Sequence, residues 1–180
     1  MGFHHVAVAA KDLAATHRFY TDAMGFELVK LNVAPTDHPD GWAKHAFYDT
    51  GGHGLIAFWD LHDPRVPADF ESGLSKAMGL PHFVNHIAFT ADGLEDLATR
   101  RQRWLDHGCD VVEIDHGWCT SIYTDDPNGT LVEWCVTTLA FTTADRDQAL
   151  AALEDPQPAL EPPPVPKFFK AAAAVTPSTR

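Results

Sequence analysis

The stretch FHHVAV, residues 3–8, returns later in the chain as VNHIAF, residues 84–89. Both stretches are rich in apolar and β-branched residues, which favours a strand, and each carries a histidine at its third position. A second related pair follows them, GLIAFW at 54–59 and GTLVEW at 129–134. Two pairs of similar segments in the same order indicate an internal repeat.

Each half of the repeat predicts one strand, one helix and three further strands. The first half has expected strands at residues 3–10, 26–34, 42–49 and 55–60 and a helix at 13–24, with Asp12 as its N-cap and Gly25 as its stop. The second half has expected strands at 83–90, 109–114, 118–124 and 130–137 and a helix at 94–107. We therefore expect an α+β fold of two tandem βαβββ modules, joined by an irregular or short helical linker at 61–81.

The domain boundary is expected near residue 140. Residues 1–140 would form one domain, with module one at about 1–62 and module two at about 82–140. Residues 141–180 predict a short helix over 143–153 and then an extended or disordered tail, because 156–166 contains six prolines and a Pro/Ala-rich end follows. This tail could also wrap onto a neighbouring subunit.

Charge and composition exclude several classes of partner. The net charge of -12 repels phosphate backbones, so nucleic acid is not an expected partner. There is no apolar run of 18 residues and no signal peptide pattern, which argues against a membrane span or secretion. Cys109, Cys119 and Cys135 lack CxxC spacing, which is typical of reduced thiols in a cytoplasmic protein.

His5 and His86 occupy the same place in the two halves of the repeat, and Glu133 lies in the last apolar strand. A pseudo-twofold axis would bring the histidines together, and a carboxylate in such a strand is costly unless it is paired or ligated. The three side chains would form a facial triad that suits non-haem Fe(II) and leaves positions open for substrate and O2. A single strand histidine is more often a hydrogen-bonded core residue, and His4 should point to the opposite face. The repeat favours the ligand interpretation.

The repeated βαβββ modules resemble the vicinal-oxygen-chelate superfamily, which includes glyoxalase I, extradiol dioxygenases, fosfomycin-modifying enzymes and bleomycin-binding proteins. The resemblance covers about residues 3–136. It implies a curved mixed sheet around a metal site, with ligands from the first and last strands of each module. Carried over, these are His5, His86 and Glu133, while the fourth position falls on Ala57 or Phe58. Both are apolar, so a four-ligand site is not expected.

A second motif resembles the extradiol ring-cleavage dioxygenase signature. It reads IDH at 114–116, then IY at 122–123, DPNG at 126–129 and Glu133. In that family the signature carries an active-site histidine and tyrosine, which implies that His116 and Tyr123 hydrogen-bond the bound catecholate. The DPNG segment is also simply a good hairpin turn. Extradiol enzymes further use an acid/base histidine, for which the candidate is His45, with His53 in a glycine-rich turn as a rival.

The resemblance therefore implies an Fe(II)-dependent extradiol dioxygenase, with Mn, Zn or Ni as other possible metals. Its partners would be a small catechol-like aromatic diol and O2, and we expect a homodimer or higher homo-oligomer. Three alternatives stay open: a glyoxalase-like lyase or isomerase, a fosfomycin-type thiol transferase, and a non-catalytic drug-binding protein of the bleomycin-resistance type.

Overall fold

The computed structural model describes residues 2–52 and 54–172. Both modules have the expected order of elements. Module one contains β1 (His5–Ala10), α1 (Leu13–Arg18), η1 (Phe19–Ala23), β2 (Glu27–Pro35), β3 (Trp42–Asp49) and β4 (Leu55–His62), and the linker adds α2 (Leu74–Ala77). Module two contains β5 (His86–Thr90), α3 (Leu94–Asp106), β6 (Val111–Asp115), β7 (Cys119–Asp125) and β8 (Leu131–Thr137).

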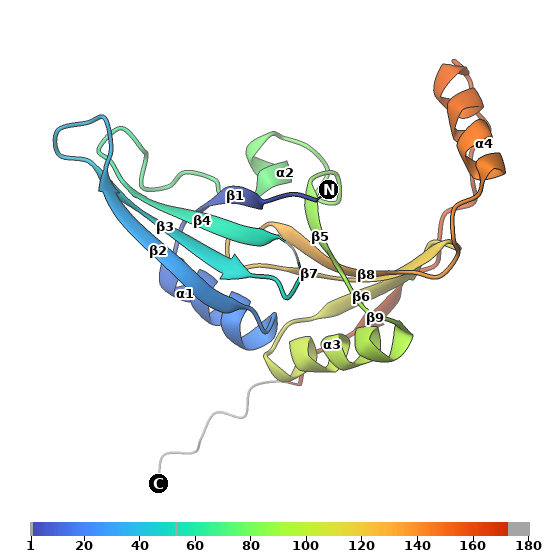
Figure 1. Ribbon diagram of the computed structural model, residues 1–180, viewed down its shortest axis with the longest axis horizontal. Coiled ribbons are helices and arrows are strands. Elements are labelled where there is room, and N and C mark those ends of the chain that lie inside the picture. Colours follow the sequence, from blue (N-terminus) through green and yellow to red (C-terminus); the bar gives the residue numbers. More distant parts are fainter. Residues whose placement is uncertain (1, 53, 173–180) are drawn as a thin grey trace, which may run out of the picture.

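The strands form two mixed sheets with equivalent orders. Sheet A runs β1-β4-β3-β2 and sheet B runs β5-β8-β7-β6-β9. In each module the first strand pairs in parallel with the last, and the other neighbouring strands are antiparallel. Figure 1 shows the two sheets as the arms of an open U, with α1 and α3 below its convex side. The α+β fold of two tandem modules is confirmed.

The first helix differs in detail from the expected helix over residues 13–24. The Asp12 side chain accepts the Ala15 N–H at 2.9 Å, as an N-cap does. The α-helix continues to Arg18, and Phe19–Ala23 then form a π-helical turn that buries both Phe19 and Tyr20. It ends before Gly25, whose φ of 82° favours glycine.

Apolar side chains fill the layer between the helices and the convex sides of the sheets. Tyr20 contacts Phe58 at 4.5 Å between ring centroids, and Phe26 contacts Phe89 at 5.0 Å across the module junction. Since strand side chains alternate between faces, the burial of this layer leaves the other set of side chains on the concave side. The largest fully buried side chains include Trp104, Tyr20, Tyr48, Phe58, Ile56, Ile122, Val111 and Val132.

The turn between β7 and β8 joins the two modules. Asp126 and Asn128 are each 5% exposed, and the Tyr20 hydroxyl of module one donates to Asp126 at 3.1 Å. The Asn128 side chain accepts the Lys11 N–H at 3.0 Å and donates to the Thr16 hydroxyl at 3.1 Å. The DPNG segment is thus a buried polar contact between modules as well as a hairpin turn.

The C-terminal region is more ordered than the sequence predicts. A capping box at Thr142 begins α4 (Thr143–Glu154), which projects from the U and buries none of its residues (Figure 1). The chain then returns, and β9 (Lys167–Phe169) pairs with β6. The sequence predicted an extended or disordered tail but not this strand, in which Phe169 packs against the core and the Arg101 guanidinium lies 4.3 Å from its ring centroid. The tail beyond residue 172 lies outside the described residues.

None of the helices in the described ranges combines the length and the apolar character that crossing a bilayer requires.

Candidate metal centre

The pairing register places the module-two candidates in one patch on the concave face of sheet B. Glu133 on β8 lies between Ala88 on β5 and Tyr123 on β7. Its neighbours in sequence, Val132 and Trp134, point to the other face and are buried in the core. Alternation along the strand therefore directs Glu133 and Tyr123 away from α3 and into the U.

His86 and Glu133 form a close pair. His86 Nε2 lies 3.0 Å from Glu133 Oε2, and His86 Nδ1 lies 2.9 Å from the Phe83 carbonyl oxygen. A carbonyl only accepts hydrogen bonds, so Nδ1 carries a proton. Nε2 of the same ring faces a carboxylate oxygen, so either a proton, which would make an ion pair, or a metal cation must lie between these two atoms.

The geometry of this pair fits a divalent metal. Neighbouring ligands at bond lengths of about 2.1 Å and right angles are about 3 Å apart, close to the observed N···O distance. An Nδ1–H donated to a backbone carbonyl is also the usual way in which a metal-binding histidine is oriented. The side chain of Glu133 is 7% exposed, so an unbalanced charge there would be costly.

Ser121 is a site residue that the sequence did not single out. It is fully buried on β7, and its hydroxyl donates to Glu133 Oε1. This bond occupies one carboxylate oxygen and leaves Oε2 directed at His86. Only the pattern of alternate residues along β7, which also selects Tyr123, could have indicated it.

His116 and Tyr123 form a second pair beside the first. His116 Nε2 and the Tyr123 hydroxyl share a hydrogen bond of 3.0 Å, and the Tyr123 ring lies 6.2 Å from the His86 ring between centroids. Burial raises the pKa of the Tyr123 phenol well above its usual value, so the phenol stays protonated and can donate. The structure thus brings together four of the six residues singled out for the site.

The other two, His5 and His45, belong to module one. His5 is exposed at the start of β1, where its Nδ1 lies 2.8 Å from His4 Nδ1 and its ring lies 5.6 Å from the Phe47 ring. Across residues 2–52 and 54–172, no three His, Cys, Asp or Glu side chains converge closely enough to hold a metal ion. His86 and Glu133 are therefore adjacent, whereas His5 is not placed in a three-ligand group with them.

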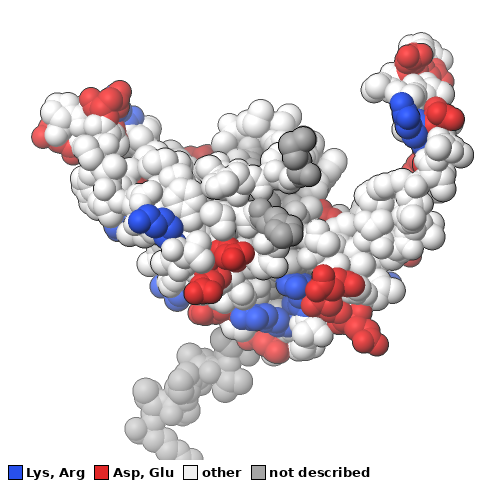
Figure 2. Space-filling model, in the orientation of Figure 1, with Lys and Arg blue, Asp and Glu red and all other residues white. Residues whose placement is uncertain are grey.

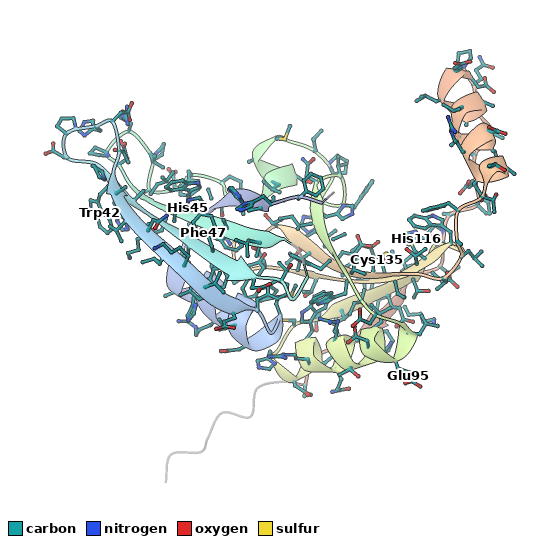
Figure 3. All side chains as sticks on the ribbon, in the orientation of Figure 1. Trp42, His45, Phe47, Glu95, His116 and Cys135 are labelled. Carbon is teal, nitrogen blue, oxygen red and sulfur yellow. The ribbon has the colours of Figure 1, made fainter. Side chains whose placement is uncertain are left out.

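His45 is buried on the concave face of sheet A. It is 9% exposed, and its Nε2 has no hydrogen-bond partner among the described residues. Its ring stacks on Trp59 at 3.7 Å and lies 4.1 Å from the Phe47 ring. Burial, with a smaller contribution from His5, lowers the pKa of His45 and favours the neutral imidazole. Figure 3 shows His45 and Phe47 on one arm of the U and His116 on the other. His53, the rival, lies outside the described residues.

The register also resolves which residue of module one corresponds to Glu133. His86 pairs with Leu131, two residues before Glu133, and His5 pairs with Leu55, two residues before Ala57. Ala57 rather than Phe58 therefore occupies the fourth position, and it cannot bind a metal.

Comparison with known proteins agrees with this fold. The model of the Glyoxalase/Bleomycin resistance protein/Dioxygenase superfamily matches residues 2–134. Biphenyl-2,3-diol 1,2-dioxygenase 2 of Rhodococcus globerulus is 35% identical over 121 residues, which cover 63% of this chain and 58% of that protein. The chain thus matches less than two thirds of that relative's length.

Solved structures show the same architecture at low identity. A glyoxylase/bleomycin resistance protein/dioxygenase domain from Frankia sp. EAN1pec has a TM-score of 0.55 at 16% identity, covering 76% of this chain and 98% of that one. The fosfomycin resistance protein FosX from Listeria monocytogenes has a TM-score of 0.54 at 20% identity, covering 77% and 95%. At such identities these likenesses concern the fold alone.

Proposed function

The chain belongs to the Glyoxalase/Bleomycin resistance protein/Dioxygenase superfamily, and we propose that within it this protein is an extradiol-type dioxygenase that opens a catechol-like ring with O2. The observation that carries the proposal is the patch on sheet B, where the His86–Glu133 pair lies next to the His116–Tyr123 pair. A carboxylate and an imidazole beside two hydrogen-bonding groups suit the binding of an ionised aromatic diol.

We propose His5, His86 and Glu133 as the ligands of one divalent metal, with Fe(II) as the preferred ion. His5 would join the other two by a change of its side-chain conformation. Its side chain has room to move because it is exposed at the first residue of β1, an edge strand of sheet A. A metal held there would supply Lewis acidity and, as iron(II), electron transfer towards O2. The three cysteines are free, which supports a reducing, cytoplasmic setting where Fe(II) persists.

The residues around the ligands have separable roles in this proposal. Tyr123 donates its phenolic proton towards a substrate oxygen, and His116 holds the phenol in place through the 3.0 Å hydrogen bond. His45, whose pKa is lowered by burial and whose Nε2 has no hydrogen-bond partner among the described residues, accepts a proton from the diol.

Module one offers an apolar surface for an aromatic ring. A groove of about 490 Å³ is lined by residues of sheet A and of the segment after β2, and several of these residues are alanines. Trp59, which stacks on His45, and Leu61 add large apolar side chains to this lining. The groove is lined by Ala7, Val8, Ala9, Ala34, Pro35, Thr36, Asp37, Ala43, Trp59 and Leu61.

The proposal is tested by loading the protein anaerobically with Fe(II) and adding air with catechol, 3-methylcatechol or 2,3-dihydroxybiphenyl. We expect a coloured ring-opened product and one O2 consumed per product, measured by absorbance and an oxygen electrode. Zn-loaded protein is the control and should give neither. Full iron occupancy without product or O2 uptake on any of the diols would reject the dioxygenase proposal.

A further inference from the structure

The turn before β5 carries the group that orients His86. The Val84 N–H donates to the Pro81 carbonyl at 3.0 Å, which closes a turn over residues 81–84. Phe83 lies inside this turn, and its carbonyl oxygen accepts the hydrogen bond from His86 Nδ1 at 2.9 Å. Whatever fixes the turn therefore also fixes the direction in which His86 Nε2 points.

One side chain of the turn, His82, reaches across sheet B. Leu131 on β8 pairs with His86 on one side and with Asp125 on the other, so these three residues form one row. Asp125 is thus two strands away from His86, at about 10 Å between the backbones. His82 Nε2 lies 2.5 Å from Asp125 Oδ1, and since a carboxylate only accepts, Nε2 donates. This hydrogen bond holds the turn to the end of β7.

The other contacts of the turn fix it less directly. The Asn85 N–H donates to the Ser75 hydroxyl at 2.8 Å, which anchors the backbone at the start of β5 but not the Phe83 carbonyl. The residues Phe83 and Val84 are 69% and 45% exposed, so side-chain packing contributes little to the position of the turn. The hydrogen bond to β7 is therefore the contact best placed to hold that carbonyl.

This hydrogen bond also borders the proposed site. His82, Asp125, Leu131 and Tyr123 contribute to the lining of one cavity of about 450 Å³. The described residues of the lining include no Lys or Arg, and in Figure 2 the surface between the arms of the U is mostly white. The lining thus holds no permanently charged donor that could replace His82 at Asp125.

We propose that His82 and Asp125 are positioning residues of the metal site. Their hydrogen bond keeps the Phe83 carbonyl beside His86 Nδ1, and so keeps Nε2 directed at Glu133 and at a metal between them. This role rests on the proposed metal site, and neither side chain is itself a ligand. The two side chains are 49% and 59% exposed, so their hydrogen bond adds little to the stability of the whole fold.

The test uses Co(II), whose binding to the full chain is measured by competition with a chelator and whose visible absorption reports its coordination. His82→Ala and Asp125→Ala should each weaken Co(II) binding about 10-fold and change the absorption, because the His86 ring loses its fixed partner. His82→Gln, which keeps an N–H at the reach of Nε2, should retain most of the affinity. His62→Ala is the matched control and should leave binding unchanged, since His62 is similarly exposed and pairs with Asp60 at 3.0 Å on sheet A.

Thermal unfolding separates positioning from a purely structural role, because the Tm of His82→Ala should stay close to that of the unmodified protein. If the unmodified protein binds Co(II) tightly and both alanine variants bind it equally well, the positioning role is wrong while the metal site stands. The role is also wrong if His82→Gln loses as much affinity as His82→Ala, or if affinity falls only together with the Tm. A protein that binds no Co(II) at all would reject the metal site and this role with it. None of these measurements requires ring cleavage.

Discussion

The two modules differ at one equivalent position of their last strands. Module two has Glu133 there, two residues after the strand partner of His86, and module one has Ala57, two residues after the strand partner of His5. Across the next strand pair, module two places Tyr123 where module one places Phe47. The backbone register is the same, but the side chains that it presents differ. A duplicated fold can therefore build one site from two unlike halves, with hydrogen-bonding groups from one module and an apolar wall from the other.

The same contrast holds two residues further along the last strand of each module. Ser121 of module two, which orients Glu133, corresponds to His45 of module one, and Cys135 corresponds to Trp59. The His45–Trp59 stack makes module one suited to an aromatic ring, while the small Ser121 makes room for the carboxylate. Substitutions can therefore test the contribution of each module to the site separately.

The largest expected effect is at Glu133. Glu133→Ala should weaken metal binding by more than about 100-fold, because loss of an outer-shell partner alone costs 10- to 100-fold. Metal content after dialysis and competition with a chelator measure this. Glu113→Ala is the matched control, since Glu113 lies on β6 and pairs instead with Arg101 of α3 and Lys167 of β9. Stoichiometric metal in Glu133→Ala would show that the ligand assignment is wrong.

The second prediction distinguishes Tyr123 from Phe47, the aromatic residues at equivalent positions of the two modules. Tyr123→Phe should lower kcat about 100- to 1000-fold and leave metal content unchanged, because it removes a hydrogen-bond donor and keeps the ring. Phe47→Leu should raise KM more than it lowers kcat. Steady-state kinetics on the best diol measure both. If Tyr123→Phe loses metal along with turnover, Tyr123 has a structural role instead.

The sequence predicted the fold well because the repeat and the alternation of apolar residues are local patterns. The elements of both modules were found within a few residues, and α3 within one. The β9 strand was missed, since three residues after a proline-rich segment carry no strand signal of their own. Its pairing depends on a distant edge that only the folded sheet supplies.

The candidate site was predictable in part for the same reason. His86, Glu133, His116 and Tyr123 come from one module, where spacing along the strands fixes their proximity. The position of His5 depends on how one module sits against the other, which spacing does not determine. Ser121 was missed because a serine in a strand has no distinctive pattern.

A third prediction compares the two hairpin turns. Asn128→Ala should lower the free energy of unfolding by about 3 kcal/mol, because it leaves the Thr16 hydroxyl and the Lys11 N–H without this partner in a buried junction. Gly52→Ala, in the exposed turn of module one, should change it by less than about 0.5 kcal/mol, since no atom lies within 4 Å of the added Cβ. Urea denaturation measures both. Equal costs would mean that the turn does not join the modules.

The smallest expected effect is at Ser121. Ser121→Ala removes the donor to Glu133 Oε1 and should weaken metal binding about 10- to 100-fold, with the carboxylate still present. Thr120→Ala, on the same strand but the opposite face, is the control and should leave the affinity unchanged. Both variants should keep the thermal stability of the unmodified protein to within a few degrees. Unchanged metal affinity in Ser121→Ala would mean that His86 and the strand alone orient Glu133. Glu133 would then be the only residue at the metal by which module two differs from module one.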